Sequence, residues 1–213
     1  MALFQKNPYD TSEHKPIYTL GLNKSVLVIG LGNIGKEYEN TRHNLGFTCV
    51  EALAVAHNLG SWVTKKDLKC QLVLGNVGDT RLILCKPTTM MNLSGEAVRA
   101  VMDFYKIADK DVVVVHDELD IDFGQIRSRV GGGTAGHNGV KSLVEHIGEG
   151  FGRVRVGIGP KSPPQIDGAD FVLGKLSKDE ESQLKHMTRE VVALLTEFIA
   201  SGKLPEETRS FIV

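Results

Sequence analysis

One polar segment near the start of the chain holds side chains that could perform acid–base chemistry. The tetrad Thr41-Arg42-His43-Asn44 follows an apolar run and a loop rich in Gly and Asn, within the stretch 26–44. An imidazole can take up or release a proton near neutral pH, and open α/β sheets bind ligands beyond the carboxyl ends of their strands. His43 is therefore a candidate general base, although an isolated histidine is more often a surface or capping residue.

Asp117 offers the carboxylate that such a histidine needs. It follows the valine run 112–115, which is typical of a strand covered on both faces, so we expect Asp117 to close that strand. If two strand ends meet, the carboxylate would fix the tautomer of the imidazole and raise the basicity of its other nitrogen, which could then deprotonate water. The competing interpretation of Asp117 is a cap or turn residue.

Three asparagines, Asn33, Asn92 and Asn138, lie in loops beside predicted elements. Their carboxamides could donate hydrogen bonds to a carbonyl or an oxyanion. Asparagine is also common in turns and helix caps, and both interpretations stay open. Because the chain has no G-x-S-x-G motif to supply a nucleophilic serine, attack by activated water is the simplest hydrolytic chemistry that these residues predict.

Two cofactor classes fit the sequence poorly. Gly30–Gly35 matches G-x-G-x-x-G, but a dinucleotide site needs a helix that opens within the glycines and an acid ~20 residues later at the end of a second strand. The polar segment 36–44 does not predict such a helix. His116 and Asp117 are neighbours on a predicted strand and point to opposite faces, and no HExxH pair exists. We expect neither a dinucleotide cofactor nor a metal ion.

Basic residues cluster in one part of the chain, although the formal net charge is only −1. Residues 121–161 hold six Lys or Arg and three acids. Alternation within the segments 125–130 and 153–158 places the arginines of each segment on one face, and the Gly-rich segment 131–139 between them could form an anion-binding nest. These basic residues could bind a phosphate backbone, or they could form a solvated face of the sheet. The residues concerned are Arg127, Arg129, Lys141, Arg153 and Arg155.

The elements that must position these residues alternate between strands and helices. Apolar runs and period-two alternation predict strands at 26–30, 69–77, 81–86, 112–115, 125–130 and 153–158. Helical spacing predicts helices at 45–59, 93–107, 138–147 and 177–202, the last opened by a capping box between Ser177 and Glu180. This pattern predicts a single-domain α/β/α sandwich with a mixed, mostly parallel twisted sheet.

Length and composition fit one soluble globular domain. The chain has 213 residues, of which 41% are hydrophobic and 24% charged, as is ordinary for such a domain. We expect this domain over 25–213, preceded over 1–24 by an arm that is a disordered tail, a docked segment or a contact with a partner. No apolar run approaches the ~20 residues that span a bilayer, and Cys49, Cys70 and Cys85 form no CxxC pair. A cytoplasmic protein without a membrane partner is therefore expected.

Several blocks of the sequence resemble one known family. In chain order the blocks are VIGLGNIGKEYENTRHNLGF, PTTMMNLSG, HDELD, GGGTAGHNG, RVRVGIG and DFVLGKL. Together, over residues 26–202, they are similar to bacterial-type peptidyl-tRNA hydrolase. The resemblance implies a monomeric α/β/α enzyme without a metal ion or other cofactor, which cleaves the ester joining a peptide to the 3′ ribose of its partner, tRNA.

The same resemblance implies roles for individual residues. His43 resembles the general base and Asp117 the carboxylate that orients it. Asn33 resembles an amide of the catalytic centre that, with Asn92, holds the peptide and the reacting carbonyl. Further contacts with the substrate are implied for Tyr38, Met91, His137 and Asn138. The acceptor-stem phosphates would be bound by Arg127, Arg129, Lys141 and Arg155.

The chain departs from the family pattern at a few positions. Ile34 stands where the family usually has Pro, Met91 replaces a usual Phe, and Thr134-Ala135 replaces residues that are commonly His or Ser and Gly. We expect a less rigid loop at Ile34 and an altered cover of the peptide cleft at 134–135. Because none of these positions is a proposed catalytic group, hydrolysis is the expected activity. The alternative is an RNA-binding module of the same fold that does not hydrolyse its ligand.

Overall fold

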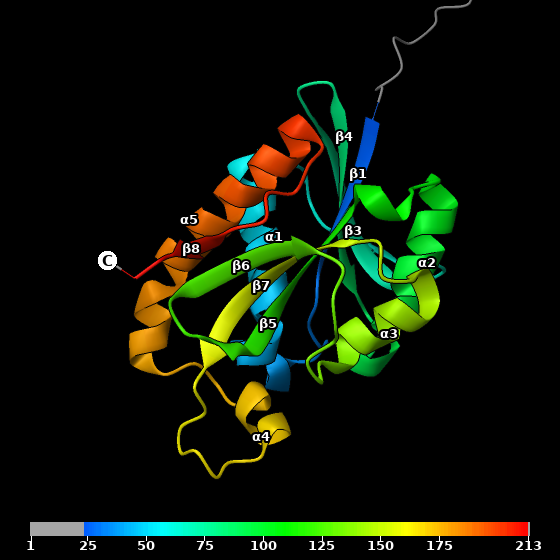
Figure 1. Ribbon diagram of the computed structural model, residues 1–213. Coiled ribbons are helices and arrows are strands. Elements are labelled where there is room, and N and C mark those ends of the chain that lie inside the picture. Colours follow the sequence, from blue (N-terminus) through cyan, green and yellow to red (C-terminus); the bar gives the residue numbers. More distant parts are fainter. Residues whose placement is uncertain (1–23, 213) are drawn as a thin grey trace, which may run out of the picture.

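The computed structural model of the protein describes residues 24–212, and its centre is one eight-stranded sheet (Figure 1). The strands lie in the order β2-β3-β4-β1-β5-β7-β6-β8. Their bounds are Lys24–Gly30 for β1, Val63–Lys65 for β2, Cys70–Val77 for β3, Thr80–Pro87 for β4, Val112–Asp122 for β5, Gln125–Val130 for β6, Gly152–Gly159 for β7 and Thr208–Ser210 for β8. Strands β4, β1, β5 and β7 are parallel, and antiparallel pairs flank them on both sides. The predicted mixed sheet is confirmed.

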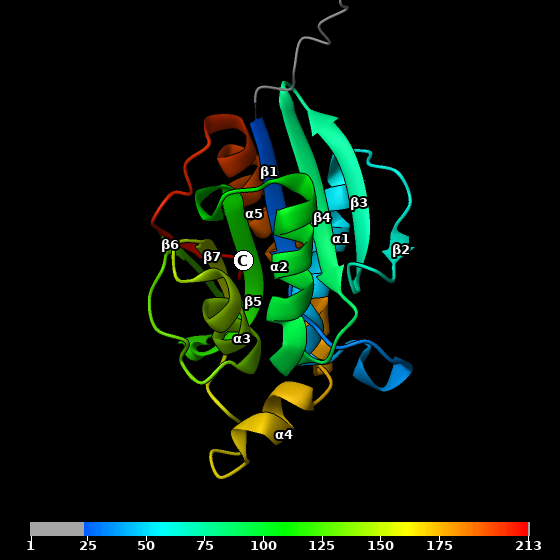
Figure 2. The same cartoon turned by 90° about the vertical axis from the view of Figure 1, so that its right-hand side faces the viewer.

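Helices cover both faces of the sheet, as Figures 1 and 2 show. Helices α1 (Leu45–Ala56) and α5 (Lys178–Ser201) pack on one face, and α2 (Ser94–Tyr105) and α3 (Asn138–Ile147) on the other. A short helix, α4 (Gly168–Leu173), lies at the carboxyl edge of the parallel strands. Single 3-10 turns are η1 at Lys36–Tyr38, η2 at Arg42–Asn44, η3 at Met91–Leu93 and η4 at Asp109–Asp111. The predicted α/β/α sandwich is confirmed.

Strand β1 shows why its sequence is an unbroken apolar run. Val26 and Val28 belong to the core beneath α1 and α5, whereas Leu27 and Ile29 belong to the core beneath α2 and α3. All four side chains are fully buried. A strand covered on both faces removes every apolar side chain from water, so apolar residues stand at consecutive positions rather than alternate ones.

The loop after β1 is fixed by a close approach between backbones. A Cβ on Gly30 would lie 2.3 Å from the carbonyl oxygen of Gly46 in α1, so only glycine allows the strand and the helix to pack at this distance. The intervening segment forms the turns η1 and η2, and α1 begins only at Leu45. The glycines of the segment Gly30–Gly35 therefore do not open an α-helix towards a pyrophosphate, in agreement with the interpretation of the sequence.

Helix α5 begins and ends as its sequence predicts. The Ser177 hydroxyl accepts a hydrogen bond from the Glu180 N–H at 3.2 Å, and the Glu180 carboxylate accepts one from the Ser177 N–H at 2.6 Å. The helix ends at Gly202, whose φ of 76° is the left-handed conformation that glycine adopts most easily. The predicted capping box and helix end are confirmed.

Strand β5 runs further than its valine run predicts. It continues to Asp122 because β7 pairs with it beyond the valines, with Asp117 opposite Val156. The prediction that Asp117 closes the strand was therefore wrong, since the residue lies inside β5. The neighbouring strand β1 ends at Gly30, opposite Val115. Asp117 thus still lies beyond the end of β1, at the carboxyl edge of the parallel centre.

Three short elements, β2, β8 and α4, are absent from the sequence-based prediction. Each has at most six residues, which is too short for hydrophobic periodicity to reveal. The arm predicted over 1–24 falls outside the described residues, except for Lys24, which is the first residue of β1. Within residues 24–212, none of the helices is both long and apolar enough to cross a bilayer.

Candidate active site

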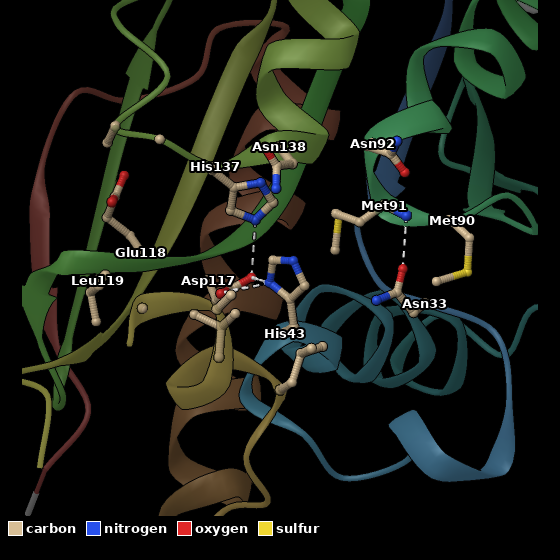
Figure 3. A pocket seen from close by; sticks show the side chains of 16 residues that line it. Asn33, His43, Met90, Met91, Asn92, Asp117, Glu118, Leu119, His137 and Asn138 are labelled. Carbon is tan, nitrogen blue, oxygen red and sulfur yellow. Dashed lines mark hydrogen bonds and ion pairs between the residues drawn. The ribbon is translucent and has the colours of Figure 1, made fainter. Parts of the chain in front are cut away.

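His43 and Asp117 meet at the carboxyl edge of the sheet, although 74 positions separate them in the chain. Turn η2 carries His43 and strand β5 carries Asp117. The Nδ1 atom of His43 lies 3.0 Å from each carboxylate oxygen of Asp117 (Figure 3). Both side chains are buried. The expected contact between the imidazole of His43 and the carboxylate of Asp117 is present, although Asp117 lies inside β5 rather than at its end.

A second imidazole also contacts Asp117, and its ring centre lies 4.9 Å from that of His43. His137 Nε2 lies 3.1 Å from Asp117 Oδ1, and its Nδ1 accepts hydrogen bonds from the N–H groups of Gly139 and Val140 in the first turn of α3. A ring nitrogen that accepts a hydrogen bond carries no proton, so the proton of His137 is on Nε2 and is donated to Asp117. The sequence predicts His137 as a substrate contact. The residue does line the cavity, but both of its ring nitrogens are already hydrogen-bonded within the protein.

Asp117 stays ionised despite its burial. Burial alone would raise the pKa of this carboxyl, but the electrostatic attraction and hydrogen bonds of His137 and His43 outweigh it and hold the pKa well below its ordinary value of 3.8. The carboxylate therefore accepts from Nδ1–H of His43, which leaves the lone pair on Nε2 of that ring. Among residues 24–212, no hydrogen bond occupies this Nε2 atom.

Asn33 is held in a single amide orientation. Its Oδ1 atom accepts a hydrogen bond from the Met91 N–H at 2.7 Å, and because a backbone N–H can only donate, this contact identifies the amide oxygen. The carboxamide of Asn44 holds the backbone N–H and C=O of Asn33 at 2.8 and 3.0 Å. The Nδ2 group of Asn33 has no hydrogen-bond partner in the described part of the chain, so it is a donor available to a ligand in the cavity.

These groups line a cavity of about 590 Å³ (Figure 3). Its polar side chains are Asn33, His43, Asn92, Asp117, Glu118, His137 and Asn138. Its apolar side chains are Met90, Met91, Leu119, Ala135, Ala169, Val172 and Leu173. A cavity that combines apolar walls with convergent polar groups is typical of a site for an organic ligand. The site residues predicted at 33, 43, 91, 92, 117, 137 and 138 are brought together here.

The wall formed by α4 is the part of the site that sequence reasoning missed. Ala169, Val172 and Leu173 of this helix line the cavity. Asp167 caps the helix by accepting a hydrogen bond from the Ala169 N–H at 2.8 Å. An aspartate shortly before an apolar pair is the local signal that could have indicated this start, but a helix of six residues shows no period.

Arg42 fastens this wall to the turn that carries His43. Its guanidinium donates to both carboxylate oxygens of Glu180 on α5, at 2.9 and 2.7 Å. The same group lies 4.3 Å from the centre of the Phe171 ring on α4 and donates to the Phe171 carbonyl. Two parallel charge-assisted hydrogen bonds form a strong and directional pair. The turn η2 and the helices α4 and α5 are thereby held together.

A second group of predicted residues lies outside the cavity, on strands β6 and β7. We call Arg127, Arg129 and Arg155 the arginine surface. Arg127 is directly opposite Arg155 on the antiparallel ladder. Burial, and then the charges of Arg129 and Arg127, lower the pKa of Arg155. The Nε atoms of Arg129 and Arg155 are buried and have no hydrogen-bond partner within residues 24–212. Positive charges held this close together favour the binding of an anion. The fourth predicted residue, Lys141, is exposed on α3.

Two predicted residues lie elsewhere. Arg153 is 1% exposed, and its guanidinium is bonded to His116 and to the carbonyl of Gly132. Both interpretations made from the sequence, a phosphate contact and a solvated face, are therefore wrong for this residue. The reason is that the glycine-rich loop after β6 covers it. Tyr38 is half-buried in η1 and is not among the residues that line the cavity.

His43, Asp117 and His137 are also the one group, among the described residues, whose donor atoms could surround a metal ion. These atoms lie within 4.8 Å of one another, and two imidazoles with a carboxylate are a known zinc donor set. A metal ion would need the lone pair of His137 Nε2. That nitrogen carries a hydrogen, because His137 Nδ1 is the acceptor for the first turn of α3. The three side chains are therefore arranged for hydrogen bonding.

The fold and the cavity define an α/β/α protein whose centre is a buried histidine–carboxylate pair surrounded by carboxamides. The sequence profile of the family described as "Peptidyl-tRNA hydrolase" matches residues 27–211. The chain belongs to the peptidyl-tRNA hydrolase family.

Individual relatives agree with this assignment. The chain is 44% identical over 174 residues to a peptidyl-tRNA hydrolase of Exiguobacterium sibiricum, covering 81% of this chain and 92% of the relative. It is 45% identical over 155 residues to that of Rickettsia canadensis, covering 73% and 83%. Among solved structures, the crystal structure of peptidyl-tRNA hydrolase from Acinetobacter baumannii is similar with a TM-score of 0.76 and 37% identity, covering 83% of this chain and 89% of that one.

Proposed function

We propose that the protein hydrolyses peptidyl-tRNA. It cleaves the ester between the peptide, or an N-acyl-aminoacyl group, and the 3′ ribose, and it releases free tRNA and peptide. The observation that carries the proposal is the hydrogen bond between His43 Nδ1 and the ionised Asp117, which leaves the Nε2 atom of His43 to accept a proton at the cavity. Membership of the peptidyl-tRNA hydrolase family supports the same substrate.

His43 acts as the general base. Its Nε2 atom takes a proton from a water molecule, the water oxygen attacks the ester carbonyl, and the proton is passed to the ribose oxygen as it leaves. Such help is typically worth ~10²–10⁴ in rate. Asp117 holds the ring in the required tautomer and stabilises the imidazolium that forms. His137 orients Asp117 through its 3.1 Å hydrogen bond.

The carboxamides stabilise the charge that develops on the carbonyl oxygen. Asn33 is supported as an oxyanion donor because its amide orientation is fixed by Met91 and its Nδ2 group is available at the cavity. One such donor is typically worth ~10²–10³ in rate. Asn92 and Asn138 hold the peptide and the attacking water. Met91 and His137 form the part of the wall against which the substrate packs.

The arginine surface binds the acceptor stem of the tRNA. Arg127, Arg129 and Arg155, with Lys141, contact its phosphates, since closely spaced cations suit a polyanion. Tyr38 stacks near the 3′ end, because aromatic rings accept any unpaired base.

We further propose that one copy of the chain works alone in the cytoplasm, where translation produces peptidyl-tRNA. The groups proposed for catalysis all come from a single chain. The family profile spans 27–211, which supports one hydrolase domain over 25–213 after an arm over 1–24.

The direct test is incubation of the protein with N-acyl-aminoacyl-tRNA, with and without a chelator. Cleavage at the same rate in both samples is the expected result, because His43 supplies the base that a metal-bound hydroxide would otherwise provide. Cleavage that the chelator abolishes would contradict the proposed metal-independent mechanism. Binding of the tRNA without cleavage would identify an RNA-binding module and contradict the hydrolase.

A further inference from the structure

Arg153 on β7 is a buried cation that the proposed chemistry does not use. Its Nη1 atom donates to the carbonyl oxygens of Gly132 and Gly133, at 3.1 and 2.5 Å. Its Nε and Nη2 atoms lie 3.2 and 3.1 Å from Nε2 of His116, and the carboxylate of Glu118 is 3.8 Å away. Burial lowers the pKa of Arg153 to about 10, so the guanidinium is still charged at neutral pH.

The hydrogen bonds of Arg153 determine the tautomer of His116. A guanidinium can only donate, so His116 Nε2 must accept and His116 Nδ1 carries the proton. The Nδ1–H group donates to the backbone carbonyl of Asp117 at 2.7 Å. Burial, together with the nearby His137 and Arg153, holds the pKa of His116 well below its ordinary value, which agrees with a neutral ring.

The two carbonyls that Arg153 holds belong to the loop that delivers His137. Gly132 has a φ of 92°, and a Cβ there would lie 2.0 Å from the guanidinium of Arg129, so the loop lies directly on the arginines. Five residues after Gly132, His137 donates to Asp117 and packs with its ring centre 4.8 Å from that of His116. Arg153 is therefore bonded to the loop on one side and, through His116, to the backbone of β5 on the other.

We propose that Arg153 is a positioning residue for the hydrolysis: with His116 it holds the glycine-rich loop against β5 so that His137 orients Asp117. This inference rests on the proposed function, and it separates Arg153 from its neighbour Arg155. Arg155 binds tRNA phosphate, whereas Arg153 acts on the catalytic centre from beneath and does not touch the substrate. A displacement of about 1 Å at a catalytic group can cost ~10²-fold in rate.

The first experiment is the imidazole ¹⁵N spectrum of the wild-type protein without tRNA. The expected result is the Nδ1–H tautomer for His116 and the Nε2–H tautomer for His137. A His116 that is charged or carries its proton on Nε2 would overturn the proposal, because Arg153 could not then donate to it. This readout needs neither a substrate nor a variant, so its failure is distinguishable from failure of the proposed function.

The second experiment compares Arg153→Met, Arg153→Lys and the control Arg99→Met, which removes an exposed arginine of α2. For Arg153→Met we expect kcat to fall ~10²-fold, with KM and the salt dependence of tRNA binding unchanged and the His137 spectrum shifted towards mixed tautomers. Arg153→Lys should retain more of the wild-type kcat than Arg153→Met does, and Arg99→Met should retain the full wild-type kcat. A raised KM with a flatter salt dependence would overturn the proposal in favour of a phosphate contact. Wild-type kcat in a folded Arg153→Met protein would also overturn it.

Discussion

At the scale of single residues, the site depends on one buried carboxylate that stays charged between two imidazoles. His137 is committed as a donor to Asp117 because its other nitrogen caps α3. His43 is then the ring with an acceptor nitrogen left at the cavity. The two histidines contact the same carboxylate but have different roles, because among the described residues only His137 has partners for its second ring nitrogen, the N–H groups of the first turn of α3.

The lowered pKa of Asp117 predicts how the protein responds to acid. A carboxyl whose pKa is lower in the folded than in the unfolded chain contributes stability that is full above the unfolded value, and this stability declines as the pH falls below that value. We expect Asp117→Asn to lower the free energy of unfolding at pH 7 by about 1.5–3 kcal/mol, and this difference to shrink below pH 3.8. Urea unfolding of both proteins from pH 7 to pH 2.5 measures it. A difference that stays constant over this range would contradict the charge assigned to Asp117.

The residue scale is also where sequence reasoning could go only part of the way. Alternation correctly places Arg153 and Arg155 on one face of β7, opposite the arginines of β6. It could not tell that the carbonyls of a loop 20 residues earlier cover Arg153 and leave Arg155 half-exposed. The pairing of His43 with Asp117 was predictable only as a meeting of strand ends, since nothing in the local sequence fixes a distance.

At the scale of elements, the turn that carries His43 depends on helices far along the chain. Arg42 in η2 joins Glu180 of α5 and Phe171 of α4. Lys175 adds a second connection, because its ammonium donates to the carbonyls of Glu37, in η1, and Glu39, directly after it. The wall and the base of the cavity are thus built from segments that meet only in the folded protein.

Loss of the Arg42–Glu180 pair should loosen this connection. Glu180→Gln keeps the size of the side chain but removes the charge, so we expect the free energy of unfolding to fall by about 1–3 kcal/mol, because both side chains are mostly buried. Asp103→Asn is the matched control: it breaks an exposed pair with Arg99 and should have a much smaller effect, because solvent screens an exposed pair. Denaturant unfolding of the two variants tests this. Equal effects would show that the buried pair adds nothing beyond a surface pair.

The strong elements were predictable from sequence because their signals are local. The valines of β5, the start of α3 at Asn138 and the capping box of α5 all appear at the predicted positions. Helix α4 and the length of β5 were not predictable, because the first is too short to show a period and the second depends on pairing with β7. Elements whose extent is set by a distant partner are those that sequence patterns miss.

At the scale of the whole molecule, the site has two parts with different chemistry. The cavity lies at the carboxyl edge of β1 and β5, and its apolar and carboxamide side chains surround the hydrogen-bonded His43 and Asp117. The arginine surface lies on the flanking strands β6 and β7. A substrate with a peptide at one end and a phosphate backbone at the other matches this division, which the net charge of −1 conceals.

Arg155→Ala tests the role of the arginine surface. We expect weaker tRNA binding and a log–log salt dependence whose slope is reduced by ~0.7–0.9, the value for one phosphate contact, with turnover at saturating substrate unchanged. The control Arg99→Ala removes an exposed arginine of α2, on a helix that does not line the cavity, and should leave binding unchanged. Binding titrations at salt concentrations from about 50 to about 200 mM, where affinities that depend on phosphate contacts change strongly, decide between these outcomes. An unchanged slope for Arg155→Ala would place the tRNA elsewhere.

The measurement that bears most directly on the mechanism is the single-turnover rate of N-acyl-aminoacyl-tRNA cleavage by His43→Ala. We predict a fall of at least ~10²-fold in a protein whose circular dichroism matches the wild type. His57→Ala, which removes a histidine at the far end of α1, should retain the wild-type rate. A folded His43→Ala protein that cleaves as fast as the wild type would contradict the assignment of His43 as the base.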